Sequence, residues 1–294
     1  MARRTFKKPA KSTTELISFL RNKGLIIDDE PYAAHCLQCV GYYRLKIYMR
    51  PLETGKQFND GVRFEDIVEL YDFDRELRLL CLDAIERIEV ALRAHIINIM
   101  GAHGGPHFYY DAGYFHSAEA VAKVKKLGAE GKHLSITHYK NQYSTPDLPP
   151  IWCLTEASTF GTISMIYADL KLQYRKEIAR EFSLSEKLCV SWFKSLSTLR
   201  NFCAHHWRLW NAELIVNKPR QARAYLDDLQ PNGSCYARLA IMQIMLKKID
   251  HDGRYRWSQR LEKLIDSRPR TVFISAIGFP EDWKDRPLWN GQLG

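Results

Sequence analysis

The chain has 294 residues, of which 46% are hydrophobic and 26% charged, an ordinary balance for a globular protein with a substantial core. No run approaches the roughly 18 to 20 apolar residues of a membrane-spanning helix. The basic N-terminal stretch lacks the apolar segment of a secretory signal, so we expect a cytoplasmic protein. The formal net charge of +9 favours polyanionic partners, nucleic acid above all, although many basic proteins bind none.

Residues 1–11 are predicted to form a basic flexible leader, which either contacts nucleic acid or is simply solvated. Five of its residues are basic: Arg3, Arg4, Lys7, Lys8 and Lys11. Residues 12–294 are predicted to form a single helical domain. The proline-containing stretch 143–150 is a possible linker ahead of the part 151–294, and it either separates two cores or crosses one.

The hydrophobic periodicity is helical almost throughout. Ser12 and Glu15 have the spacing of a capping box before a short helix that stops at Gly24, and Ser183 and Glu186 repeat this spacing. No alternating strand pattern persists, so the fold class is expected to be all-α. The predicted helical stretches are 12–24, 31–49, 64–100, 151–158, 161–166 and 183–200, with two more separated by turns at 231–233 and 252–253.

The seven cysteines are expected to be reduced in a cytoplasmic protein. Cys36 and Cys39 form a CxxC pair preceded by His35, but zinc needs about four ligands and no second pair completes the set. The same residues fit a helix in which small thiols pack as hydrophobic groups. We therefore expect neither a metal site nor a cofactor.

The segment RNFCAHHWRLWN, residues 200–211, is the most unusual in the chain. If it is helical, Asn201 and His205 share one face, whereas Arg200 and His205 lie about 140° apart around the axis. The pattern gathers a cation, an amide and an imidazole instead of continuing an amphipathic stripe. The alternative is a buried polar helix start, in which His206 and Trp207 merely pack.

These groups suit the cleavage of an RNA phosphodiester by its neighbouring 2′-hydroxyl. Histidine can accept or donate a proton near neutral pH, and arginine can stabilise the charge that develops on the phosphoryl oxygens. One histidine is unsuited to both proton transfers of a single step. Either His205 and His206 divide the work, or a two-fold dimer supplies a second copy of the motif. We favour the dimer.

The stretch LRNFCAHHWRLWN resembles the R-x4-6-H element of HEPN-domain ribonucleases, in the form R-N-x3-H. Other stretches, in sequence order, make nearly the whole chain similar to the Abi-like (AbiD/AbiF) abortive-infection family of bacteria; among them are GYYRLKIYMRPL, LPPIWCLTEASTFGTISMIY and GFPEDWKDRPLW. The resemblance implies a HEPN-like helical bundle, with additional N-terminal and C-terminal helices, that dimerises to assemble its site. It also implies a metal-independent endoribonuclease that acts as a toxin-like effector in phage defence.

Carried onto this chain, the resemblance makes Arg200 the motif arginine, Asn201 the polar residue after it and His205 the catalytic histidine. His206 fits only the looser spacing of the motif and is included as a candidate catalytic residue. The expected partners are RNA, a second copy of the chain and an antitoxin, which is either an RNA or a protein, and no membrane. Two rivals are an RNA-binding HEPN protein without nuclease activity and a protein that uses the motif to dock a partner.

Six further residues are candidates for RNA contact. Arg208 either holds a flanking phosphate or pairs with a nearby carboxylate. Tyr42, Tyr43 and Arg44 are candidates for a second RNA-contact surface, although packing with a solvated edge is favoured for them. Trp207 and Trp210 are candidates for base stacking, but tryptophans three apart on a helix more often fill a core.

Overall fold

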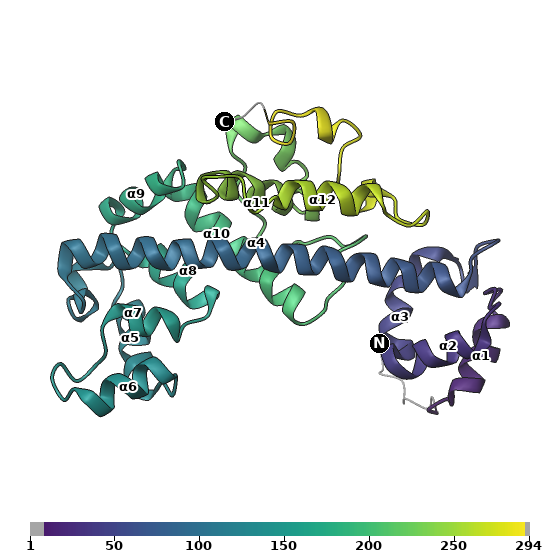
Figure 1. The fold of residues 1–294 in the computed structure, drawn as a ribbon, viewed down its shortest axis with the longest axis horizontal. Helices are drawn as coiled ribbons and strands as arrows, with labels where there is room; N and C mark the ends of the chain where they lie inside the picture. Colours follow the sequence, from purple (N-terminus) through teal and green to yellow (C-terminus); the bar gives the residue numbers. More distant parts are fainter. Residues whose placement is uncertain (1–8, 292–294) are drawn as a thin grey trace, which may run out of the picture. The chain divides into compact units, whose positions relative to one another are not determined.

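The computed structural model describes residues 9–291. Of the predicted basic leader, only residues 9–11 belong to this part, and Arg3, Arg4, Lys7 and Lys8 lie outside it. The structure is mostly helical, with 65% helix and 3% strand, which confirms the all-α prediction. The α-helices are α1 (Thr13–Arg21), α2 (Glu30–Cys36), α3 (Tyr42–Met49), α4 (Phe64–Gly104), α5 (Ala118–Glu130), α6 (Leu134–Gln142), α7 (Ile151–Glu156), α8 (Phe160–Asp169), α9 (Leu172–Glu181), α10 (Glu186–Ala204), α11 (Cys235–Ile249) and α12 (Trp257–Asp266) (Figure 1). Strands β1 (Glu53–Thr54) and β2 (Gln57–Phe58) pair as a short antiparallel hairpin.

The chain divides into two compact units. The first comprises the residues up to Leu77 together with Leu264–Phe273, and the second comprises Arg78–Lys263 together with the residues from Ile274 onward. Residues 143–150 contain no helix and lie inside the second unit. Within residues 9–291, no helix combines the length and the apolar character needed to cross a membrane.

Local signals predict the start of α1 correctly but not the start of α10. The Ser12 hydroxyl accepts a hydrogen bond from the Glu15 backbone N–H, and the Glu15 carboxylate accepts one from the Ser12 N–H, as in a capping box. At α10 the N-cap is Ser185, whose hydroxyl accepts from the Leu188 N–H. The box predicted at Ser183 is wrong, because Ser183 has a φ of 53° and belongs to the preceding turn.

Two other predicted helical stretches are interrupted at positions that the sequence did not predict. The helix predicted over 31–49 is interrupted by the π-helical turn η1 (Leu37–Gly41), where Gly41 has a φ of 91° that an L side chain rarely adopts. The break predicted at Gly161 lies instead at residues 157–159, and Gly161 is the second residue of α8.

In the first unit, α1 packs against α2 (Figure 1). Leu20 of α1 and Ala33 of α2 are fully buried. The Tyr48 hydroxyl of α3 donates to the buried carboxylate of Asp74 at 2.7 Å, which anchors α3 on the first half of α4.

In the second unit, α10 packs chiefly against α8 (Figure 1). The Phe193 ring lies 5.3 Å from the rings of both Tyr167 and Phe182, in edge-on contacts that suit aromatic quadrupoles. Gly161 permits the close approach of α8, since a Cβ at that position would lie 3.2 Å from the Ser197 hydroxyl. The buried stripe of α10 has helical spacing and consists of Cys189, Trp192, Phe193, Leu196, Leu199 and Cys203.

Helix α11 carries a fully buried arginine. The Arg238 guanidinium donates to the backbone carbonyls of Leu214 at 2.7 Å and Val216 at 3.3 Å, and to those of Ser234 at 3.1 Å and Asn232 at 3.4 Å. Burial lowers the pKa of Arg238 to about 10. Because its acceptors come from two loops, Arg238 fixes the chain after α10 against the start of α11.

Candidate active site at the end of helix α10

The four residues predicted to be catalytic lie together at the C-terminal end of α10. Asn201 belongs to its last turn, Arg200 is the residue just before that turn, His205 is the C-cap and His206 is the next residue. All four are exposed to solvent. The alternative of a buried polar helix start does not describe them, because the segment ends a helix and faces solvent.

The helix ends in a Schellman motif, in which the residue after the C-cap is left-handed. His206 has a φ of 58°; its N–H donates to the Cys203 carbonyl at 3.0 Å, and the Trp207 N–H donates to the Phe202 carbonyl at 2.8 Å. The hydrophobic contact typical of this motif is the stack of Phe202 on Trp207, with ring centroids 4.6 Å apart and planes inclined by 9°. This cap holds the two histidines in defined and different backbone conformations.

His205, unlike His206, continues the face of α10. Its φ of −90° and ψ of 10° stay near the helical region, and its N–H donates to the Asn201 carbonyl at 2.9 Å. Asn201 and His205 therefore extend a polar stripe that begins at Lys194 and Thr198. Among residues 9–291, the side chains of Arg200, Asn201 and His205 form no hydrogen bond or ion pair with the protein. They are available to a ligand.

The sequence of this helix and of the segment after it carries an excess of positive charge. No aspartate or glutamate occurs between Glu186 and Glu213, and Arg200 near the end of α10, Lys194 at its middle and Lys187 in its first turn are all exposed. The negative end of the helix dipole would oppose an incoming phosphate by about 0.3–1 kcal/mol. A charge-assisted hydrogen bond from arginine contributes about 1.5–3 kcal/mol. Attraction by Arg200 therefore outweighs the dipole, and the satisfied carbonyls of the cap weaken the dipole further.

Sequence reasoning missed two residues that shape the site. Phe202 supports the Trp207 ring, and Arg78 of α4 donates to the Trp207 carbonyl at 3.4 Å from a side chain that is almost entirely buried. The spacing of Phe202 and Trp207 is the signal for the first, because positions five apart meet in a Schellman cap. Arg78 has no comparable signal, since 129 residues separate it from Trp207.

The other predicted RNA-contact residues differ in exposure and in the unit to which they belong. Arg208 is half-buried and donates to the Asn211 carbonyl at 2.9 Å, which turns part of its guanidinium toward the backbone. Tyr43 is 76% exposed and Arg44 is half-buried, but both belong to the first compact unit whereas the motif belongs to the second. Trp210 is buried.

The CxxC pair is split between the interior and the surface. Cys36 is buried and burial raises the pKa of its thiol, whereas Cys39 is exposed, with its sulfur 3.7 Å from the nearer ring nitrogen of His35. Within residues 9–291, no three His, Cys, Asp or Glu side chains are grouped as metal ligands.

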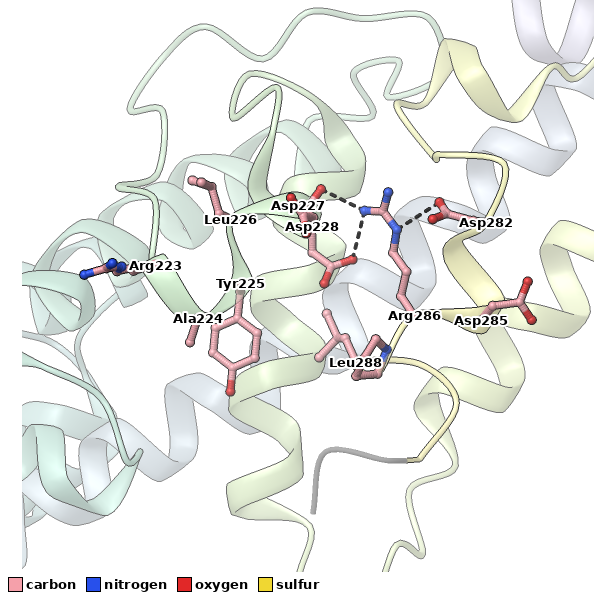
Figure 2. Close-up of a pocket in the computed structure, with 11 residues that line it drawn as sticks. Arg223, Ala224, Tyr225, Leu226, Asp227, Asp228, Asp282, Asp285, Arg286 and Leu288 are labelled. Atoms are coloured by element: carbon pink, nitrogen blue, oxygen red, sulfur yellow. Dashed lines mark hydrogen bonds and ion pairs between the residues drawn. The ribbon is translucent and has the colours of Figure 1, made fainter.

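A cavity of about 620 Å³ lies elsewhere in the second unit. Figure 2 shows the Arg286 guanidinium between Asp228 and Asp282, to which it donates at 3.4 and 2.9 Å. The lining of the cavity contains four aspartates and two arginines, and this acidic balance is unsuited to an RNA backbone. None of the predicted site residues belongs to this lining. The lining residues are Arg223, Ala224, Tyr225, Leu226, Asp227, Asp228, Asp282, Asp285, Arg286, Pro287 and Leu288.

Comparison with known proteins identifies a family. The model of a family described as Abi-like protein matches residues 35–211, more than half of the chain, and the matched region ends at the last residue of the RNFCAHHWRLWN segment. Neither the curated proteins nor the solved structures yield a match.

Proposed function

Because the chain belongs to the Abi-like protein family, which implies a role in abortive-infection defence against phage, we propose that it acts there as a metal-independent endoribonuclease. The observation that carries this proposal is the end of α10. There Arg200, Asn201 and His205 are exposed and without side-chain partners among residues 9–291, in a stretch that contains no acidic residue.

The proposed reaction is an attack by the 2′-oxygen of one nucleotide on its own 3′-phosphate. A bond forms between this oxygen and phosphorus, and the bond from phosphorus to the 5′-oxygen of the next nucleotide breaks. A neutral imidazole takes the 2′-hydroxyl proton, and a protonated imidazole gives a proton to the leaving 5′-oxygen. The products are a 2′,3′-cyclic phosphate and a free 5′-hydroxyl.

The residues divide these tasks according to their chemistry. His205 transfers the proton, since it continues the helical face that Asn201 shares, whereas the backbone of His206 turns away at a φ of 58°. Arg200 binds the phosphoryl oxygens through its guanidinium fork. Asn201, one turn before His205, orients the phosphate or the imidazole. The second imidazole comes from another copy of the chain, so the active species is a two-fold dimer with a composite site.

The test is the cleavage of end-labelled RNA in EDTA. His205→Ala should lower the cleavage rate by about 10²- to 10⁴-fold, and Arg200→Ala by about 10²- to 10³-fold, with unchanged circular dichroism. The matched control is His138→Ala, which removes an exposed histidine of α6 in the same unit and should leave the rate unchanged. End-group analysis should find 2′,3′-cyclic phosphate.

Three outcomes would count against the proposal. If His205→Ala cuts as fast as the wild type, the assignment of the histidine is wrong. If the wild type binds RNA tightly but yields no product, the protein is an RNA-binding member of the family. If light scattering finds that the cleaving species is a monomer, the composite site is wrong.

A further inference from the structure

The two tryptophans of the segment have opposite environments. Trp210 is buried at 2% exposure, whereas Trp207 is 58% exposed although it is the bulkiest kind of apolar side chain. One face of the Trp207 indole lies flat on the Phe202 ring at 4.6 Å. With one face covered and more than half of the residue exposed, the indole presents a flat aromatic surface to solvent.

This surface is held in place by three backbone and ring contacts. The Trp207 N–H donates to the Phe202 carbonyl, Arg78 donates to the Trp207 carbonyl, and the Phe202 ring supports the indole from beneath. A ring immobilised in this way gives up little further conformational freedom when a ligand stacks on it.

The surroundings of Trp207 favour an anionic ligand with a flat ring. Trp207 follows His205 and His206 directly in a stretch that contains no acidic residue, and Arg200 lies five residues before His205, about 140° around the helix axis. An exposed aromatic ring among basic groups is the arrangement by which proteins hold unpaired nucleotides, with the base on the ring and the phosphate on the cations.

We propose that Trp207 is a stacking platform for an unpaired base of RNA, next to the phosphate that Arg200 and His205 engage. This inference rests on the proposed function, which it sharpens, because the platform selects single-stranded RNA. Paired bases are already stacked within a duplex and offer no free face to the indole.

The first experiment measures the affinity of the full chain for a fluorescent single-stranded RNA with 2′-O-methyl groups, which bind but lack the attacking hydroxyl. Trp207→Leu keeps an apolar contact with Phe202 and removes the aromatic face, whereas Trp207→Phe keeps both. We expect Trp207→Leu to weaken binding by about 5- to 150-fold and Trp207→Phe to retain it. The matched control is Trp152→Leu, which alters an exposed tryptophan of α7 in the same unit and should have no effect.

A second measurement needs no variant and applies even if Trp207→Leu fails to fold. Single abasic nucleotides are placed in turn along the 2′-O-methyl RNA, and binding to the wild-type chain is measured. One abasic position beside the bond that is cut in ordinary RNA should weaken binding within the same range.

The outcomes separate this inference from the one on which it rests. If Trp207→Leu binds as tightly as the wild type, or if no abasic position weakens binding, while ordinary RNA is still cut, the platform is refuted and the nuclease stands. The same holds if Trp207→Leu alters only the association of the protein with itself. If the wild type neither binds nor cuts RNA, both proposals fail.

Discussion

Substitutions at His206 separate the backbone role of this residue from the chemistry of its side chain. A non-glycine residue in the left-handed region costs about 1–2 kcal/mol, and His206 has a φ of 58°. Glycine removes this cost but gives up about 0.5–1 kcal/mol through the greater freedom of the unfolded chain. His206→Gly should therefore raise the free energy of unfolding by about 0–1.5 kcal/mol. His206→Val should lower it by about 1–2 kcal/mol, because a β-branched residue tolerates this conformation least.

The assay combines urea unfolding, followed by far-ultraviolet circular dichroism, with RNA cleavage by the same samples. The matched control is Ala204→Gly, two residues earlier on the exposed face of the helix, where glycine should lower the free energy of unfolding by about 1 kcal/mol. If His206→Gly destabilises the protein as much as Ala204→Gly does, the reasoning about the cap is refuted. If His206→Gly folds but loses as much cleavage as His205→Ala, the proton transfer does not belong to His205 alone.

Three further predictions concern the second unit. Arg238→Met should lower the free energy of unfolding, measured in urea, by about 2–4 kcal/mol, because it leaves buried carbonyls without a donor. A loss of less than about 0.5 kcal/mol, as for an ordinary surface substitution, would contradict this. Burial lowers the pKa of His95 below 6.5, so the unfolded chain binds the proton more strongly than the folded chain does. The contribution of neutral His95 to the free energy of unfolding should therefore be fully present above pH 6.5 and should be lost as the pH falls below 6.5. Replacement of His95 by Phe should flatten the dependence of unfolding on pH between 5 and 7.5, and parallel curves would refute the assignment. Gly161→Leu should lower the free energy of unfolding by about 1–3 kcal/mol, because the new side chain collides with Ser197. Gly101→Ala has open space around its Cβ and should raise the free energy of unfolding by about 0.5–1 kcal/mol. Equal effects of the two substitutions would contradict the packing argument.

The sequence by itself predicted most of the helices of this protein. The long run of apolar residues at helical spacing from Phe64 predicts α4, and turns at 231–233 and 252–253 correctly separate α11 from its neighbours. The capping box at Ser12 sets the start of α1, because its hydrogen bonds join residues only three apart. Such features depend on local spacing, which the order of the residues contains in full.

Local spacing failed where several endings or starts were possible. Ser183 and Ser185 both precede α10 with suitable cap chemistry, and only the conformation of the chain as it leaves α9 selects Ser185. Gly41 is compatible with a helix in isolation, yet in the structure it has a φ of 91° at the boundary between η1 and α3.

The candidate site shows the same division between sequence and structure. The spacing of Arg200, Asn201 and His205 could be read from the chain, as could their chemistry. The sequence has no glycine or proline that would end the helix there, and only the tertiary structure stops α10 at Ala204 and turns His206 left-handed. The buried Arg78 of α4, which binds the Trp207 carbonyl, and the support of the indole by Phe202 hold this ending. The hydrogen bond from Arg78 joins residues 129 positions apart, and no local pattern in the sequence records it.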